Sequence, residues 1–198
     1  MTATKTPFGL RAGRRRGGVP NGSSQNTYRI ANGYATDLFE GDPVALNATG
    51  TIQIVSATGT AGYATGVFRG CVFNNPLNGN QPTFSRRWTA ATSTTDGSKP
   101  YAYVEDDPNA TFIIQADASI TAGDVGYNFD VSLGAGVTAT GSSTTVLKAS
   151  TRTVGTALIQ VVGLFDRVDN AFSNEVVTDL YPLVEVRWDN HRDFDTSI

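Results

Sequence analysis

Short runs in which apolar and polar residues alternate recur along most of the chain, and such runs predict β-strands that are buried on one face. Between positions 27 and 166 they come roughly every 8–12 residues, a spacing typical of sandwiches and small barrels. No segment shows the period of a long amphipathic helix. The pattern therefore predicts an all-β fold, a small antiparallel barrel or sandwich of about ten short strands with extended N- and C-terminal arms.

The most apolar runs predict the strands at the centre of the fold. Residues 157–165 form the most hydrophobic run, and residues 112–114 are continuously apolar, which is typical of a buried strand. Residues 63–73 are also apolar but contain Gly66 and Gly70. Glycine inside a strand indicates a bulge or a bend, as at the corner of a barrel.

The two ends of the chain lack this alternation. Residues 1–26 carry prolines, glycines and a cluster of arginines, and we predict a basic, extended N-terminal arm whose removal leaves the fold intact. Residues 27–166 are the predicted β-body. Residues 167–198 are predicted to hold a flexible connection, one strand of alternating character and a polar, extended tail.

Charge separates the N-terminal arm from the rest of the chain. Charged residues make up only 17% of the sequence, whereas about a quarter is typical, and this favours turn-rich β-structure over charged helices. Five of the fifteen basic residues lie in the first sixteen positions, and the remaining ten face all eighteen acidic residues. A basic arm on an acidic body favours docking to an acidic protein surface. It disfavours nucleic acid, because no second basic patch continues the contact.

Two large apolar residues, Phe8 and Leu10, stand out in the otherwise polar arm. They either insert into a partner as anchors or fold back onto the chain's own body, and both alternatives stay open at this point. The basic residues that would make salt-sensitive contacts to an acidic partner are Arg11, Arg14, Arg15 and Arg16.

Residue types that carry chemistry are few and scattered. The single cysteine, Cys71, excludes an internal disulfide, and its apolar neighbours indicate a small buried hydrophobic residue. The single histidine, His191, stands among aspartates near the C-terminus. Their spacing matches no metal motif, so a solvated tail is the favoured interpretation. Glu105 and the two aspartates after it are interpreted as a solvated turn.

Known catalytic motifs are absent from the sequence. There is no nucleophile elbow, no phosphate-binding loop and no zinc-protease motif, and no apolar run approaches the roughly 20 residues of a membrane helix. Phe84 with Arg86, Arg87 and Trp88 can stack on a base or a sugar, although ordinary packing at a strand edge is favoured. We therefore predict a protein that is not an enzyme, with no catalytic, cofactor-binding or metal-binding residue.

Five segments, in a fixed order, carry a resemblance to a known family. They are Pro7-Phe8-Gly9-Leu10-Arg11, Phe39-Glu40-Gly41-Asp42-Pro43-Val44, Gly66-Val67-Phe68-Arg69-Gly70-Cys71-Val72-Phe73, Tyr101-Ala102-Tyr103-Val104-Glu105-Asp106-Asp107-Pro108 and Ile159-Gln160-Val161-Val162-Gly163-Leu164. Together they resemble small head proteins of tailed bacteriophages of marine and cyanobacterial hosts, which are decoration or cement proteins. The resemblance implies a barrel-like all-β body, trimers at threefold and quasi-threefold positions of the capsid, arms across neighbouring capsid subunits, and no catalytic residue or cofactor. The triple arginine of the arm departs from the family's pattern and leaves open which surface the arm touches.

The resulting hypothesis is a virion structural protein on the outer surface of the capsid. Its expected partners are the major capsid protein and further copies of itself in a homotrimer, with neither nucleic acid nor membrane. The candidate capsid contacts are Phe8, Leu10, Arg11, Arg14, Arg15 and Arg16. The candidate contacts between subunits are Val184, Val186 and Trp188, on a strand that is either exchanged between protomers or laid on the capsid. The alternative is a carbohydrate-binding or host-adhesion module with exposed aromatic residues such as Trp88 and Tyr101, and a hydrolase with a dispersed carboxylate pair is more remote.

Overall fold

The computed structural model describes residues 5–15, 25–56, 63–165 and 181–194. These residues form fourteen β-strands and three 3₁₀ turns, without an α-helix, which confirms the all-β prediction. The strands are β1 (Arg11–Arg15), β2 (Gln25–Ile30), β3 (Leu38–Phe39), β4 (Pro43–Leu46), β5 (Thr51–Ile54), β6 (Gly66–Asn75), β7 (Gln81–Ser85), β8 (Arg87–Trp88), β9 (Tyr101–Glu105), β10 (Ala110–Gln115), β11 (Asn128–Ser132), β12 (Val146–Thr153), β13 (Ile159–Leu164) and β14 (Leu183–Trp188). The turns are η1 (Pro76–Asn78), η2 (Ala122–Asp124) and η3 (Arg192–Phe194).

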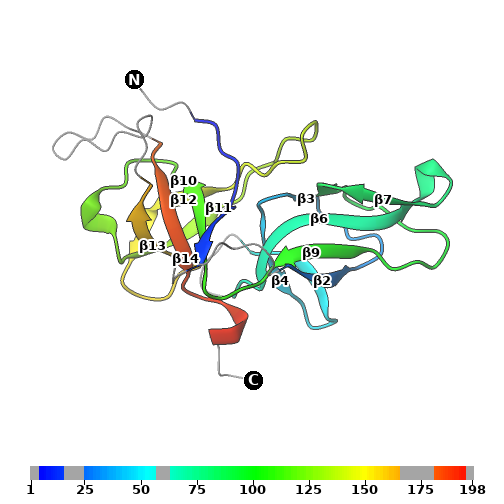
Figure 1. The fold of residues 1–198 in the computed structure, drawn as a ribbon, viewed down its shortest axis with the longest axis horizontal. Helices are drawn as coiled ribbons and strands as arrows, with labels where there is room; N and C mark the ends of the chain where they lie inside the picture. Colours follow the sequence, from blue (N-terminus) through cyan, green and yellow to red (C-terminus); the bar gives the residue numbers. More distant parts are fainter. Residues whose placement is uncertain (1–4, 16–24, 57–62, 166–180, 195–198) are drawn as a thin grey trace.

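Two lobes make up the molecule (Figure 1). In the barrel lobe, the strands follow the order β4-β5-β2-β9-β6, and a pairing between β4 and β6 closes them into a five-stranded barrel. β7 forms a hairpin with β6, and the short β3–β8 ribbon packs against β6. In the sheet lobe, the order is β1-β10-β14-β13-β11-β12. All pairings between these strands are antiparallel, apart from the parallel pair of β2 and β5.

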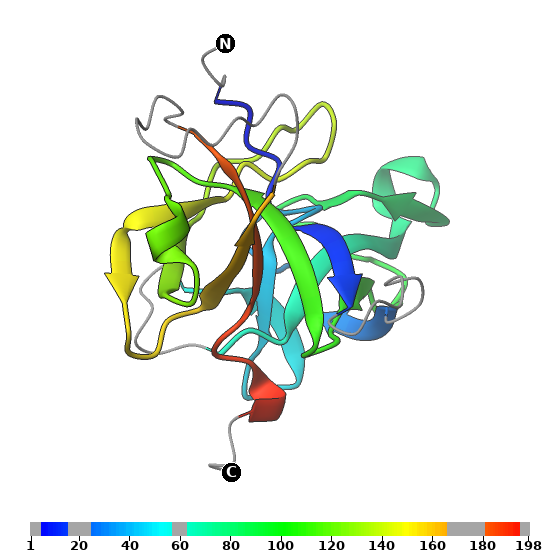
Figure 2. The ribbon, with the colours of Figure 1, turned by 60° about the vertical axis from the view of Figure 1, so that its left-hand side comes forward.

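The chain begins in one lobe, builds the other and then returns. β1 belongs to the sheet lobe, β2 to β9 build the barrel lobe, and β10 to β14 complete the sheet lobe. Figure 2 shows β1, in blue, lying beside β10, in green. The two lobes are therefore not consecutive domains, because the sheet lobe needs segments from both sides of the barrel lobe.

The two lobes meet along an apolar boundary. Val44 of β4 points into the barrel, where it packs in a cluster with Phe68 and Trp88. The next residue, Ala45, belongs instead to the cluster that includes Phe112 and its neighbours in the sheet lobe. Because successive side chains of a strand point to opposite faces, β4 contributes to both cores at once. The sheet lobe thereby covers one side of the barrel.

A bulge at Gly70 interrupts the longest strand of the barrel. The pairing of β6 with β9 shifts register between Phe68 and Gly70, which confirms the irregularity that the sequence predicts. Gly70 has a φ of +133°, and a Cβ atom there would lie 2.9 Å from the ring of Phe84. Glycine at this position therefore lets β7 fold closely over β6.

The ends of the chain differ most from their predictions. Residues 11–15 are not part of a free arm, because β1 pairs with β10, and residues 25 and 26 already belong to β2. Residues 192–194 of the predicted extended tail form the turn η3. The rest of the two predicted arms, residues 1–4, 16–24, 166–180 and 195–198, lies outside the described residues.

β14 also lies elsewhere than predicted. It sits between β10 and β13 in the middle of the chain's own sheet, and Val184, Val186 and Trp188 are at most 1% exposed. Alternation of apolar and polar residues put these three on one face, and that face is the core of the sheet lobe. Their side chains already pack within one chain, and as candidate contacts between subunits they stay a prediction.

Candidate functional site

The N-terminal segment is fastened to both lobes through Leu10. This side chain is fully buried in the sheet-lobe core. Its backbone N–H donates to the Gly41 carbonyl oxygen at 2.9 Å, and its carbonyl accepts from Nη1 of Arg69 at 3.0 Å, both in the barrel lobe. Leu10 therefore folds back onto the chain's own body, which is one of the two alternatives that the sequence left open. Phe8 is half-buried beside it.

Two glycines allow this close approach. Gly9 has a φ of +72°, and a Cβ atom there would lie 2.6 Å from the Gly41 carbonyl oxygen and from Cβ of Ser143. Gly41 has a φ of +100°, and its Cβ would lie 2.9 Å from the carbonyl oxygen of Phe8. Only glycine fits such contacts without displacing the backbone. The segment is thus held where three parts of the chain meet.

A buried carboxylate, Asp42, joins the lobes next to this contact. Its Oδ1 accepts hydrogen bonds from Oγ of Ser143 at 2.5 Å and Oγ1 of Thr145 at 3.0 Å, and its Oδ2 accepts from the Phe39 N–H at 2.8 Å. Burial raises the pKa of Asp42 above its usual value, although these hydrogen bonds favour the charged form. Oγ of Ser143 also accepts from the Thr145 N–H at 3.0 Å, so the arrangement links the lobes.

An ion pair between Arg69 and Glu105 lies behind the N-terminal segment. Both side chains are nearly buried, with exposed fractions of 11% and 5%. Because Arg69 also donates to the Leu10 carbonyl, it connects β6, β9 and the N-terminal segment. The prediction of a solvated turn is therefore wrong for Glu105, which ends β9 with its side chain turned inward.

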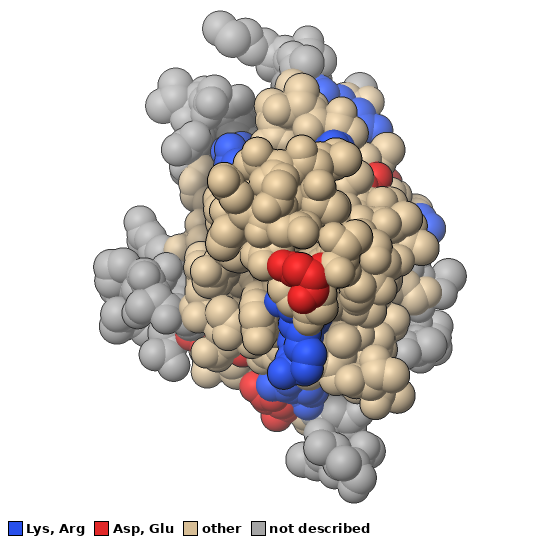
Figure 3. Space-filling model, turned by 90° about the vertical axis from the view of Figure 1, so that its right-hand side faces the viewer, with Lys and Arg blue, Asp and Glu red and all other residues tan. Residues whose placement is uncertain are grey.

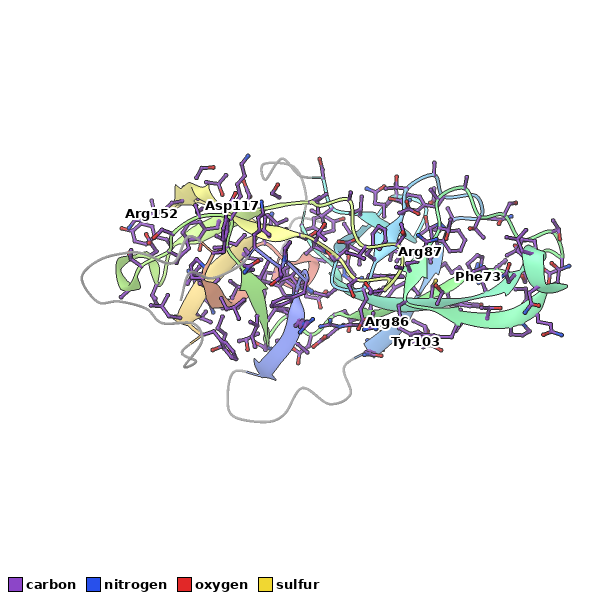
Figure 4. All side chains as sticks on the ribbon, turned by 90° about the horizontal axis from the view of Figure 1, so that it is seen from above. Phe73, Arg86, Arg87, Tyr103, Asp117 and Arg152 are labelled. Atoms are coloured by element: carbon purple, nitrogen blue, oxygen red, sulfur yellow. The ribbon has the colours of Figure 1, made fainter. Side chains whose placement is uncertain are left out.

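A groove rich in arginine opens at this junction, and we call it the basic groove. It consists of two hollows, of about 160 Å³ and about 290 Å³, which share Arg86 in their walls. Arg11, Arg69, Arg86 and Arg87 contribute four positive charges to the lining, and Glu40 is the single acid of the two hollows. Figure 4 shows Arg86 near the junction of the lobes. The groove is thus basic on a chain whose net charge is −3.

The arginines of the basic groove differ in their availability. Arg69 is paired with Glu105, and Arg86 with Glu40. Arg11 forms no ion pair with any described residue, and its guanidinium carbon lies 4.1 Å from the centroid of the Phe8 ring. Stacking on Phe8 leaves the edge of this guanidinium free for a carboxylate. Phe8, Leu10 and Arg11, three of the predicted contact residues, therefore do lie together.

Of the other three predicted arginines, the structure describes only the backbone of two. Arg14 and Arg15 belong to β1 by their backbone, and Arg16 lies outside the described residues. The charged groove residues that the contact prediction missed are Glu40, Arg69, Arg86 and Arg87. The sequence marked Arg86 and Arg87 only as part of a basic and aromatic cluster. It gave no sign of Glu40 or Arg69 beside them, because the groove is built from segments far apart in the chain.

Aromatic side chains cover part of the barrel's outer surface, and we call this part the aromatic face. Phe84 on β7 and Tyr101 on β9 both lie opposite Val72 on β6, and they are 59% and 42% exposed. The rings of Phe84 and Tyr103 are 6.3 Å apart, and Figure 4 shows Tyr103 on the barrel lobe. Trp88 does not contribute, because it is fully buried and its Nε1 donates to the Tyr34 carbonyl.

The aromatic face borders the basic groove at Phe84, which lines the same hollow as Arg86 and Arg87. Figure 3 shows that the barrel-lobe end of the molecule is mostly uncharged, with acidic and basic side chains confined to small clusters. The prediction that Trp88 is an exposed residue that stacks on a ligand is wrong, whereas Tyr101 is exposed as predicted. The face therefore offers stacking surface with two arginines at its border.

His191 is buried rather than solvated. Its ring packs between those of Trp188 and Phe194, with centroids 6.0 Å and 5.8 Å away. Its Nε2 lies 2.9 Å from the Thr65 carbonyl oxygen, and the Asp193 N–H donates to its Nδ1 at 3.1 Å. A nitrogen that accepts carries no proton, so Nε2 donates to Thr65 and the ring is neutral. The predicted solvated tail is wrong for His191, because two rings and a carbonyl bury this residue.

Acid should weaken the fold through His191. Burial lowers its pKa from the usual 6.5, so the unfolded chain binds a proton at a pH where the folded chain does not. Stability is therefore full above about pH 6.5 and falls as the pH drops towards the folded-state pKa, by at most about 1.4 kcal/mol per pH unit. Urea unfolding between pH 7.5 and pH 5.5 measures this slope, since the chain has one histidine.

The His191→Gln variant is the control for this slope. Glutamine keeps an N–H that can donate towards Thr65 but does not titrate, so the variant should lose most of the pH dependence in this range. The raised pKa of Asp42 works in the opposite direction at lower pH, which is why the two proteins are compared at each pH. Equal slopes for both would contradict the assignment.

Other candidate chemistry is sparse in the described part of the chain. Cys71 is buried, as predicted, and burial raises the pKa of its thiol to about 12, so it is not a nucleophile at neutral pH. No group of three metal-ligating side chains occurs among the described residues. No helix in the described ranges is long and apolar enough to span a membrane.

Comparison with known proteins gives no relative from which to transfer a function. The chain matches no protein-family model, no curated protein and no solved structure at a significant level. Function has to be argued from the basic groove and the aromatic face themselves.

Proposed function

We propose that the chain is a phage virion structural protein that binds the outer surface of the assembled capsid and stabilises it as a homotrimer. The basic groove carries this proposal. It concentrates four arginines at the junction of the lobes of an otherwise acidic chain, and Arg11 there lacks a partner among the described residues. An acidic protein surface would complement it.

The build of the molecule supports a role in attachment. Leu10 and Arg69 hold the N-terminal segment on both lobes, so the groove is formed before a partner arrives. A preformed surface loses less entropy on binding. A ligand that binds only the assembled shell stabilises it by mass action, and three copies in one trimer would multiply a weak single contact.

The aromatic face favours a second candidate function, a carbohydrate-binding or host-adhesion module. Phe84 and Tyr101 expose flat apolar surface beside Tyr103, and aromatic rings of this kind can stack on sugar rings. The two surfaces share Phe84, which also lines the second hollow of the basic groove, but Tyr101 belongs to the aromatic face alone. A single substitution can therefore separate them.

Co-sedimentation with empty, expanded heads tests the proposal. The wild-type protein should pellet with the heads in a saturable manner and raise their melting temperature. Free protein should sediment as a trimer of about 63 kDa, three times the 20.9 kDa of the chain.

Tyr101→Ala is the discriminating variant for this experiment. It removes an exposed ring of the aromatic face, and Tyr101 lines neither hollow of the basic groove. Head binding should stay within about twofold of wild type, because exposed contacts away from an interface contribute little. If the heads pellet alone while the protein is retained on host polysaccharide in a Tyr101-dependent manner, the adhesion function replaces the capsid function.

A further inference from the structure

We propose that the open edge of β1 accepts an acidic, extended segment of the capsid protein as an added β-strand, with Arg11 binding its carboxylates. The inference rests on the proposed capsid function and names the chemistry of the partner. Edge strands present unpaired backbone groups and are natural templates for such addition.

The sheet lobe has an open edge at β1. β1 is the outermost strand of the sheet lobe and pairs only with β10 among the described residues. At Leu10, the backbone N–H and C=O are taken by Gly41 and Arg69 of the barrel lobe. Alternate residues of a strand direct their backbone groups to the same edge. Ala12, which is exposed and lines the basic groove, is therefore the next residue with backbone groups on that edge.

Arginine side chains give this edge a positive charge. β1 has the sequence RAGRR. Arg11 is exposed, stacked on Phe8, and unpaired with any described acid, whereas Arg69 and Arg86 are already held by Glu105 and Glu40. A strand laid along β1 would bring its carboxylates within reach of Arg11, where a charge-assisted hydrogen bond can form.

The open edge of β1 is selective against other copies of the chain. Two β1 strands placed edge to edge would face each other with arginines, and like charges opposite each other are unfavourable. The pairing with β10 also shifts register between Ala12 and Arg15, so a regular ladder can form only at the start of β1. The edge thus disfavours self-association and favours an acidic partner over a short length.

A synthetic peptide of alternating glutamate and valine is the probe for the isolated protein. It should bind the full chain, with an affinity that falls as salt rises, and it should slow hydrogen exchange at the Ala12 amide. The same peptide with N-methylated backbone should bind much more weakly, because it keeps the charges but cannot pair as a strand. Equal binding of the two peptides would overturn strand addition.

Three variants locate the contact. Arg11→Glu should weaken peptide binding about tenfold or more. Lys148→Glu is the matched control, because Lys148 is exposed on β12, the opposite edge of the same sheet, and it should stay within about twofold of wild type. Ala12→Pro removes the N–H on the open edge and should abolish binding, with circular dichroism confirming the fold. A loss in Lys148→Glu equal to that in Arg11→Glu would overturn the site.

Head binding separates this inference from the proposed function. If the wild-type protein and Lys148→Glu pellet with the heads but Arg11→Glu does not, both the capsid function and the β1 contact stand. If heads pellet all three proteins equally, the capsid function stands and the β1 edge is not the contact. If heads pellet none of them, the capsid function fails, and with it the partner named for this edge.

Discussion

Replacing Leu10 by alanine should lower the free energy of unfolding by about 2–5 kcal/mol, the usual cost of truncating a fully buried leucine. Leu10 is fully buried in the sheet-lobe core although it lies in a polar, basic stretch of sequence. Its loss leaves a cavity at the point where the N-terminal segment meets both lobes. Chemical denaturation followed by tryptophan fluorescence measures the effect, because Trp188 belongs to the same cluster.

Leu77→Ala provides the matched control for this substitution. Leu77 lies in η1 at the end of the β6–β7 hairpin and is 95% exposed, so the same change should cost less than about 0.5 kcal/mol. A small effect at Leu10 as well would mean that the N-terminal segment detaches readily. It would restore the prediction that residues 1–26 are dispensable for folding, which the burial of Leu10 now opposes.

Breaking the ion pair at Arg69 should have an effect of similar size. Arg69→Met removes the cation that pairs with the nearly buried Glu105 carboxylate and the donor to the Leu10 carbonyl. Loss of one partner of a buried pair costs about 3–5 kcal/mol. Urea unfolding of the variant measures this cost. The double variant Arg69→Met, Glu105→Leu should recover part of it, since the carboxylate that Arg69 neutralises is removed as well.

Arg86→Met is the comparison for this pair. Arg86 is also paired with a glutamate, Glu40, but its side chain is 58% exposed. Exposed pairs contribute about 0–1 kcal/mol, so this variant should remain close to wild type in stability. Similar losses at Arg69 and Arg86 would contradict the view that burial distinguishes the two pairs.

Strands could be predicted from the sequence wherever their side chains alternate or their apolar runs are long. The run at 157–165 became β13 in the middle of a sheet, and the glycine at position 70 marked a true bulge. These features depend on neighbouring residues alone. Local pattern therefore contained enough information for the fold class.

The arrangement of the lobes and the groove could not be predicted in this way. Leu10 is buried in a cluster whose other members, from Ala45 to Trp188, all lie far along the chain, and no pattern around it differs from that of a free arm carrying an anchor. His191 stands in a polar stretch, and its burial depends on Trp188, Phe194 and Thr65. Arg69 and Glu105 are polar residues whose burial is possible only because they meet each other.

The return of the chain to the sheet lobe has a consequence for synthesis on the ribosome. The barrel lobe, built from β2 to β9, can fold while later residues are still being made, because its strands are consecutive. The N-terminal segment cannot dock at that stage, because β10, with which β1 pairs, emerges much later. The Thr6 amide, for example, donates to the side chain of Gln115, 109 positions further on. The N-terminal segment thus leaves the ribosome before its contact residues and is among the last parts to dock. Until then its basic strand and Leu10 stay exposed beside a folded barrel, which makes this interval the time when a nascent chain is most open to a chaperone.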